Sequence, residues 1–289
     1  MPELPEVETI VRGLQTRIAG DTIESVWIGS RPQVLKTPAA AIVSTLEGKR
    51  VVRVHRAGKH IVVDLDQPPH NQPRKRSNSK KKKNGTGATL QTAQWIIHLG
   101  MTGRTIVCES AEEIVKHTHL IAKLGSGREV RFIDPRMFGK LSVHATGFDP
   151  GGIEPLEATE EQFIQLFRGR KTPIKSALLN QKLLRGVGNI YADESLFRAG
   201  IRPRRRAASL TRDQLRRLYR AVQEVLAEAI ALGGSSVSDY VDADGEQGFF
   251  QLEHRVYGRE SEPCLVCKSP IRRVVLVGRS SHYCPKCQK

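Results

Sequence analysis

The chain begins Met1-Pro-Glu-Leu-Pro-Glu, which places an imino acid beside two carboxylates. Removal of Met1 would leave Pro2 as the chain terminus, flanked by Glu3 and Glu6. A terminal amine titrates near pH 8 and a lysine at about 10.4, so the terminal amine is far more often neutral at pH 7. A neutral amine attacks a carbonyl-like carbon to form a Schiff base, and a secondary amine gives an iminium cation directly. Pro2 is therefore a candidate nucleophile for covalent catalysis.

The same stretch also has the features of an ordinary helix start. Pro5 suits the first helical turn, and Glu6 suits the positive end of a helix. Apolar residues then recur at helical spacing from Val7 to Ile18, until Gly20 ends the pattern. The two interpretations are compatible, because a rigid helix holds a terminal nucleophile in place.

Four of the five cysteines form two Cys-x-x-Cys pairs with sixteen residues between them: Cys264, Cys267, Cys284 and Cys287. Two such pairs match a tetrahedral four-thiolate zinc site, which is structural because no position remains for water. Two disulfides are the alternative, but they are typical of an oxidising compartment. The fifth, Cys108, lies in a strand pattern and is predicted to be a small core residue.

Between the cysteine pairs the pattern predicts a β-hairpin. We expect strands over Arg272–Val277 and Ser281–Tyr283, with Gly278-Arg279-Ser280 as the turn. On such a support Arg279 suits a contact with a phosphate, although an exposed turn arginine without a partner is the plainer interpretation.

Length and composition limit the class of protein. With 289 residues and 39% apolar residues, the chain can build one large or two ordinary domains with a packed core. It has no run of about 18 apolar residues, which argues against a membrane span. Its first twenty residues do not follow the basic-then-apolar pattern of a secretory signal. We therefore expect an intracellular, cytoplasmic protein.

The charge balance points to a polyanionic partner. The net charge is +16, which favours nucleic acid over a membrane surface because no basic amphipathic helix stands out. Residues 67–93 hold seven cations and no acid, and subtracting them leaves +9, so the rest of the chain is still basic. This segment is predicted to be a solvated loop that either attracts DNA phosphates nonspecifically or is a tolerated insertion.

The first half of the chain predicts an antiparallel β-sandwich or barrel. Short β-rich runs follow the first helix and are separated by Gly, Pro and Asp turns. We expect strands at Thr22–Ile28, Arg50–Arg56, His60–Leu65, Gln94–Leu99, Arg104–Cys108, His119–Leu124, Glu129–Ile133 and Lys140–His144.

The second half predicts a helical domain. Pro and Gly cluster in a linker at 147–157, and helical spacing dominates afterwards. We expect helices at Glu160–Arg168 and Ile174–Gln181, another over Ile190–Arg198 with Asn189 as its N-cap, and a longer one that begins at Thr211. The segment 234–250 is either a lid or binding loop or a plain connector. The predicted domains are 1–146, 158–250 and 251–289.

Three motifs together resemble bacterial formamidopyrimidine-DNA glycosylase. They are PELPEVE at the start, Gly186-Val-Gly-Asn-Ile-Tyr191 in the helical half, and the terminal four-cysteine finger. The resemblance covers nearly the whole chain apart from the basic insertion. It implies an α+β protein, in which an N-terminal helix and antiparallel β-sandwich precede a helix–two-turn–helix domain and a zinc-ribbon-like hairpin. It also implies one structural zinc ion, damaged double-stranded DNA as partner and a monomer.

The resemblance implies a catalytic set. Members excise oxidised purines and then cut the strand by β,δ-elimination, with the processed terminal proline, here Pro2, as nucleophile on the sugar C1′. Glu3 matches the carboxyl group that assists ring opening by donating a proton, and Glu6 matches a supporting acid. Lys59 matches a lysine beside the lesion phosphates, and Arg279 matches the finger arginine associated with the later elimination.

The resemblance also implies a DNA-binding set. The target base must leave the duplex before C1′ can be reached, and side chains then fill the gap. Met101, Arg136 and Phe138 match those side chains, with Arg136 also reading the orphaned cytosine, although core packing is the plainer interpretation of Met101 and Phe138. Matches to DNA backbone contacts are His117, Arg170, Lys171 and Asn189. Segment 234–250 corresponds to the loop that closes over the lesion.

One departure and two alternatives remain open. Met137 stands where many relatives carry a second arginine, so one phosphate contact is expected to be missing. The endonuclease VIII-like branch acts on oxidised pyrimidines, but it commonly begins PEGPE. A non-enzymatic zinc-containing DNA-binding protein is the second alternative, and it gives Pro2 and Glu3 no reason to stand together.

Overall fold

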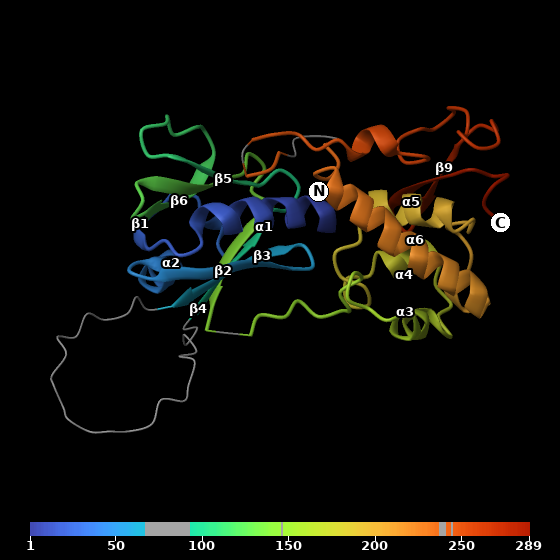
Figure 1. The fold of residues 1–289 in the computed structure, drawn as a ribbon, viewed down its shortest axis with the longest axis horizontal. Coiled ribbons are helices and arrows are strands. Elements are labelled where there is room, and N and C mark those ends of the chain that lie inside the picture. Colours follow the sequence, from blue (N-terminus) through green and yellow to red (C-terminus); the bar gives the residue numbers. More distant parts are fainter. Residues whose placement is uncertain (67–92, 146, 237–240, 244) are drawn as a thin grey trace, which may run out of the picture. The chain divides into compact units, whose positions relative to one another are not determined.

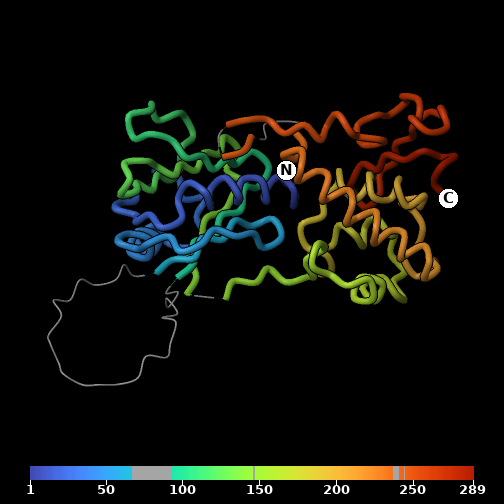
Figure 2. Tube along the Cα trace, in the orientation of Figure 1, coloured from blue at the N-terminus to red at the C-terminus, as the bar shows by residue number. Residues whose placement is uncertain are grey.

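The structure is a computed structural model that describes residues 1–66, 93–145, 147–236, 241–243 and 245–289 (Figures 1 and 2). The predicted basic loop therefore lies outside the described residues, apart from Ala93. The chain divides into two compact units. The helical unit comprises Met1–Ile10, Arg56–His60 and Asp149–Lys289, and the sandwich unit comprises Val11–His55 and Ile61–Phe148.

Helix α1 (Leu4–Ile18) confirms the predicted N-terminal helix. Its apolar positions are buried along one stripe, and Gly20 follows at φ +89°, a conformation that favours glycine and ends the helix. The boundary between the units falls within α1, so its first residues belong to the helical unit. Among the described residues, none of the helices is both long and apolar enough to cross a membrane.

The sandwich unit is built on two four-stranded sheets, as predicted (Figure 1). One sheet has the order β1-β6-β7-β5 and the other β2-β3-β4-β8. The pairs β1–β6, β6–β7, β5–β7 and β4–β8 are antiparallel. The strands are β1 Ile23–Ile28, β2 Arg50–Ala57, β3 His60–Asp66, β4 Ala93–His98, β5 Arg104–Glu109, β6 Thr118–Leu124, β7 Arg128–Ile133 and β8 Lys140–His144.

Each of these strands lies within two residues of its predicted bounds. The strands could be predicted because they contain buried β-branched residues, such as Val51, Ile61, Val63 and Val130. Turn residues separate one strand from the next. Cys108 is buried at the end of β5, as predicted. Helix α2 (Ala39–Leu46) and the 3-10 turn η1 (Pro32–Val34) were not predicted, because both are short and show little helical periodicity.

The helical unit contains α3 (Glu160–Phe167), α4 (Ile174–Leu178), α5 (Asn189–Arg198) and α6 (Arg212–Ala231), and two 3-10 turns, η2 (Ala207–Ser209) and η3 (Phe250–Glu253). The long helix starts where the sequence predicted it, with Thr211 as the N-cap of α6. Thr211 also forms a capping box with Gln214. The predicted helix at 174–181 is shorter than expected and ends at Leu178. The helices enclose one apolar core that also includes Leu4 of α1.

The chain ends in the predicted hairpin, formed by β9 (Arg272–Leu276) and β10 (Arg279–Tyr283). The position of its turn was predicted wrongly. The turn is Val277-Gly278, with φ of +49° and +74°, so Arg279 begins β10 and pairs with Leu276. The prediction failed because a β-branched residue rarely adopts positive φ.

Candidate active site

The start of the chain is held firmly within the helical unit. Leu4 is fully buried in the helical core, and its backbone N–H donates to the carbonyl of Gly186 at 3.0 Å. Gly186 has φ +89°, and a Cβ there would lie 2.8 Å from the Leu4 side chain. Pro2 is buried, whereas Met1 is 48% exposed. Because Leu4 is anchored in this way, Pro2, two residues before it, is held in a defined position.

The carboxylate of Glu3 binds the N-terminal end of α5. Its oxygens accept hydrogen bonds from the backbone N–H groups of Ile190 at 3.0 Å and Tyr191 at 3.5 Å. The prediction that Asn189 caps this helix is therefore wrong: Gly188 is the N-cap residue and makes no side-chain cap bond. The capping oxygen comes from Glu3, which is distant in sequence.

Gly188 makes this contact possible. A Cβ on Gly188 would lie 2.2 Å from the carboxyl carbon of Glu3, much closer than any real Cβ contact. The missing side chain of Gly186 thus leaves space for Leu4, and the missing side chain of Gly188 leaves space for Glu3. The close approach of the N-terminal residues therefore explains why glycine occupies both positions of the Gly-Val-Gly-Asn motif.

Glu6 lies directly beside Glu3 and collects three donors. Its carboxylate accepts hydrogen bonds from the backbone N–H of Glu3 at 2.7 Å, from the backbone N–H of Ser235 at 2.8 Å and from the hydroxyl of Tyr191. Burial, reinforced by the neighbouring charge of Glu3, raises the pKa of Glu6 to about 7. Glu6 therefore ties the N-terminus, α5 and the start of segment 234–250 together.

Lys59 is positioned by the turn between β2 and β3. Arg56 is almost fully buried and pairs with Glu8 and, through two hydrogen bonds of 2.9 Å, with Glu154. The turn itself needs positive φ at Gly58, which has φ +60°. Lys59 is 8% exposed. The Arg56 ion pairs thus fix the turn that carries Lys59 to the rest of the helical unit.

The ionisable groups around Pro2 influence one another. Burial raises the pKa of Glu3, and the charge of Lys59 opposes that shift. Burial lowers the pKa of Lys59 against the opposing charges of Glu3 and Glu6, and the cation of Arg279 adds to the lowering. A buried carboxyl that retains its proton and a lysine that loses its proton readily are typical of acid–base sites. Such a set can deliver and accept protons around a covalent intermediate formed at Pro2.

The hairpin that carries Arg279 is tied to the helices by a buried ion pair that the sequence analysis did not identify. Lys175 Nζ lies 2.7 Å from Asp193 Oδ1 and donates to the backbone carbonyl of Ser280 at 2.6 Å. Asp193 also accepts from the backbone N–H of His282 at 2.9 Å. Burial lowers the pKa of Lys175, and the carboxylate of Asp193 opposes that shift. These contacts hold β10 in place immediately after Arg279.

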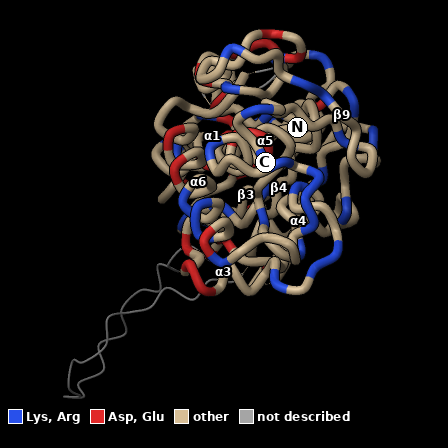
Figure 3. Tube along the Cα trace, turned by 90° about the vertical axis from the view of Figure 1, so that its right-hand side faces the viewer, with Lys and Arg blue, Asp and Glu red and all other residues tan. Residues whose placement is uncertain are grey.

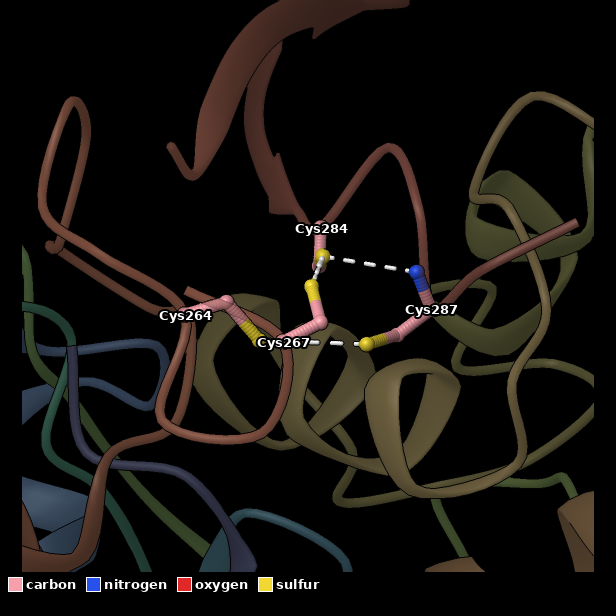
Figure 4. Close-up of side chains that lie close together, drawn as sticks. All are labelled: Cys264, Cys267, Cys284 and Cys287. Carbon is pink, nitrogen blue, oxygen red and sulfur yellow. Dashed lines mark hydrogen bonds between the residues drawn. The ribbon is translucent and has the colours of Figure 1, made fainter. Parts of the chain in front are cut away.

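The four finger cysteines converge on one point (Figure 4). Their sulfur atoms all lie within 4.8 Å of one another, with 3.9 Å between Cys264 and Cys287 and 3.4 Å between Cys267 and Cys284. A tetrahedral zinc–thiolate site with bonds of about 2.3 Å requires sulfur atoms about 3.8 Å apart. The four cysteines therefore fit one structural zinc ion.

The predicted DNA contacts of the helical unit lie on its surface or in the site. Arg170 and Lys171 are exposed in the segment between α3 and α4, as a backbone contact requires. Asn189 begins α5 beside the Glu3 contact, and its Oδ1 has no hydrogen-bond partner among the described residues. In Figure 3 basic segments are prominent around α4 and β9, and acidic segments lie beside α3 and α6.

The sandwich unit brings the other predicted set together. Met101 is 43% exposed and Phe138 is 47% exposed, so neither is a core residue. The guanidinium of Arg136 lies over the ring of Phe138, 4.7 Å from its centroid. His117 lies in the same unit and adopts a φ of +69°. The positions of these side chains are compatible with a wedge, which stays a prediction.

Segment 234–250 is closed at its base by hydrogen bonds. Phe250 N donates to the Gly234 carbonyl at 2.9 Å, and Gly248 N donates to Ser236 Oγ at 2.9 Å. Ser235, which the sequence analysis did not select, contacts Glu6 through its N–H and His254 through its hydroxyl at 3.1 Å. The base of the loop is thus attached to the site, whereas residues 237–240 and 244 of the segment lie outside the described residues.

Two site residues, Tyr191 and Ser235, were missed because their roles depend on the fold. Tyr191 stands in the Gly-Val-Gly-Asn-Ile-Tyr motif, and its place in that motif was a usable signal. Ser235 lies in a Gly-Gly-Ser-Ser run whose composition indicates only a turn or loop. Its backbone N–H, which any residue except proline would supply, makes the contact with Glu6.

Comparison with protein-family models gives three matches in chain order. Residues 1–141 match the formamidopyrimidine-DNA glycosylase N-terminal domain, 152–241 the formamidopyrimidine-DNA glycosylase H2TH domain, and 261–289 the zinc finger found in FPG and IleRS. The chain belongs to the formamidopyrimidine-DNA glycosylase family. The third match agrees with the four-cysteine geometry described above.

Relatives that bear this family name match the chain over its full length. A formamidopyrimidine-DNA glycosylase of Solibacter usitatus is 42% identical and one of Gluconobacter oxydans is 40% identical, each with 100% of both chains covered. The MutM (Fpg) structure from Thermus thermophilus is 39% identical with a TM-score of 0.81, and the match covers 99% of this chain and 98% of that one. A Lactococcus lactis Fpg variant bound to DNA containing Fapy-dG is 31% identical with a TM-score of 0.84, covering 100% of both.

Proposed function

We propose that this protein is a bifunctional DNA-repair glycosylase that removes oxidised purines, such as 8-oxoguanine and formamidopyrimidines, and then cleaves the strand. The observation that carries the proposal is the placement of Glu3 and Glu6, buried beside Pro2 and held by α5, in a chain of this family. A structural role alone does not require two adjacent buried carboxyl groups at a chain terminus, because burying charge is costly.

Pro2 acts as the nucleophile once Met1 is removed. Its imino nitrogen attacks the sugar C1′, the C1′–base bond breaks with its electrons leaving on the base, and the proton lost by the nitrogen neutralises the departing base. Glu3 donates a proton to the ring oxygen, so that the sugar opens and an iminium forms between Pro2 and C1′. The raised pKa of Glu3 supports this role, because it favours the protonated carboxyl that donation requires.

Strand cleavage follows from the iminium. The iminium acidifies C2′, and loss of a C2′ proton expels the 3′ phosphate. A second proton loss expels the 5′ phosphate, and water then hydrolyses the remaining iminium and releases Pro2. Lys59 and Arg279 bind these phosphates. The cation of Arg279 contributes to the lowered pKa of Lys59, which supports a common anionic ligand for the two side chains.

DNA binding draws on residues of both units. Met101, Arg136 and Phe138 fill the space that the flipped base leaves, and Arg136 reads the opposite cytosine. His117, Arg170, Lys171 and Asn189 contact the backbone, and Cys264, Cys267, Cys284 and Cys287 hold the zinc ion that stabilises the finger. All of these groups come from one chain, so we propose that the protein acts as a monomer.

Oxidised pyrimidines are a second candidate substrate class. One Lactococcus lactis Fpg, 30% identical with a TM-score of 0.83, was solved in complex with DNA containing an oxidized pyrimidine. The two candidates are separated by single-turnover excision from matched duplexes that carry 8-oxoguanine or an oxidised pyrimidine. Faster excision of the pyrimidine would overturn the purine assignment.

Borohydride trapping tests the nucleophile. With an 8-oxoguanine duplex, the reduced covalent complex should form with the normal protein, and mass spectrometry should place the adduct on a Pro2 terminus. Pro2→Gly should form far less adduct and release far less base, whereas the matched variant Pro5→Ala should retain both. Normal trapping by Pro2→Gly would refute the assignment.

A further inference from the structure

A tryptophan on the sandwich unit is exposed without an evident structural reason. Trp27 lies near the end of β1 and is 51% exposed, although burying a tryptophan is strongly favourable. Gly29 follows it, and a Cβ on Gly29 would lie 3.3 Å from the edge of the Trp27 ring. The indole thus leans over a glycine backbone and leaves much of its surface to solvent.

Trp27 borders a surface hollow of about 210 Å³. Thr118 and His119, the first residues of β6, also line the hollow, and the N–H of Gly29, which follows β1, donates to the His119 carbonyl at 2.9 Å. Arg31, Lys116 and His117 also line the hollow. None of the described residues that line it carries a carboxylate. An aromatic face and two cations, Arg31 and Lys116, therefore share one open cavity.

The backbone of His117 is held by a hydrogen bond to the residue after β7. Its φ of +69° is uncommon for a residue other than glycine, and its carbonyl accepts a hydrogen bond from Asp134 N at 3.0 Å. His117 is also a predicted contact to the DNA backbone. The hollow therefore adjoins the predicted path of a DNA strand.

We propose that this hollow is a second DNA subsite, which binds a nucleotide of an unpaired strand by stacking its base on Trp27 and pairing its phosphate with Arg31 and Lys116. Every base has a π-face, so stacking on an aromatic side chain beside cations is the usual means of holding single-stranded DNA without sequence preference. The subsite is separate from the carboxyl groups around Pro2 and requires no damaged base.

Intrinsic fluorescence tests the proposal directly, because the chain has two tryptophans and the other, Trp95, is 1% exposed. The indole N–H of Trp95 has no hydrogen-bond partner among the described residues, so Trp95→Phe removes no such bond and leaves Trp27 as the sole reporter. Titration of Trp95→Phe with an undamaged single-stranded oligothymidylate should quench the remaining emission.

The affinity of a labelled oligothymidylate, measured by anisotropy, supplies the second arm. Trp27→Ala should weaken binding roughly tenfold, within the range for one base stacked on an aromatic ring, and Trp27→Phe should restore most of it. Lys116→Gln should lower the slope of log affinity against log salt by about 0.7, as expected for one phosphate contact on a single strand.

Three results would overturn the proposal: no quenching of Trp27 at saturating oligothymidylate, equal affinity of Trp27→Ala and the parent, or an unchanged salt slope in Lys116→Gln. Melting temperatures of the variants confirm that each is folded. Because the oligonucleotide is undamaged, the outcome is independent of the glycosylase assignment, and Pro2→Gly should show the same quenching as the parent.

Discussion

The hydroxyl of Thr102 donates a hydrogen bond of 2.5 Å to the fully buried carboxylate of Asp134. This contact joins the loop that carries Met101 to the loop that carries Phe138. The same carboxylate accepts from the backbone N–H of Gly139 at 2.7 Å. The loops touch closely, since a Cβ on Gly100 would lie 2.4 Å from the Phe138 backbone. Asp134 therefore positions both exposed apolar side chains.

Asp134→Asn should impair removal of damaged bases. The asparagine NH2 group would replace one carboxylate oxygen and would face a donor, an N–H or an O–H, instead of accepting from it. A buried donor that loses its acceptor costs about 1–3 kcal/mol. We expect base excision in single turnover to fall roughly tenfold. Cleavage at a preformed abasic site should fall less, because no base has to be displaced there.

Thr102 supplies the matched controls. Thr102→Ser keeps the hydroxyl and should retain excision, whereas Thr102→Val should resemble Asp134→Asn. Equal losses of excision and abasic-site cleavage would contradict a positioning role for the loops and indicate a general folding defect, which melting temperatures would show.

Gly188→Ala tests the contact that orients Glu3. The added Cβ would come within 2.2 Å of the Glu3 carboxyl carbon, so the carboxylate would have to leave the N-terminus of α5. Loss of a positioned acid typically costs 100-fold or more, and we expect excision to fall roughly 100-fold. Gly125→Ala, where a Cβ meets only ordinary contacts of 3.4 Å, is the control. Retention of full activity by Gly188→Ala would remove Glu3 from the mechanism.

The capping of α5 by Glu3 is a contact that the sequence does not predict. Strand positions and the cysteine site were predictable, because alternation of apolar residues and Cys-x-x-Cys spacing are local signals. The sequence predicts Asn189 as the cap because Asn commonly caps helices, yet the capping oxygen comes from Glu3, nearly two hundred positions away. The ion pair of Lys175 with Asp193 likewise could not be predicted from the sequence, because only folding brings the two side chains together.

Glu6 should make the protein less stable as pH rises. Its pKa is raised from 4.5 to about 7, so between these values the folded state holds a proton that the unfolded state has lost. Stability therefore falls with rising pH across this window. Glu6→Gln cannot ionise, so its free energy of unfolding relative to the parent should increase from pH 5 to pH 8 by up to about 3 kcal/mol.

Urea unfolding of both proteins at the two pH values gives this difference. The exposed variant Glu24→Gln, measured in the same buffers, corrects for general effects of removing a carboxylate. A difference between Glu6→Gln and the parent that stays constant with pH would contradict a raised pKa for Glu6.

Zinc should be required for the finger to hold Arg279. Cys264 and Cys284 are fully buried among Phe197, Val256 and Ile271, so their metal site is also the centre of the small finger core. Structural zinc supplies about 10–16 kcal/mol in isolated finger peptides, which is more than this core can replace. Cys264→Ser should therefore lower the zinc content from one ion per chain to nearly none, and weaken binding to an abasic-site duplex. Cys108→Ser, which alters the one cysteine outside the finger, should keep both, and normal zinc content in Cys264→Ser would exclude the four-thiolate site.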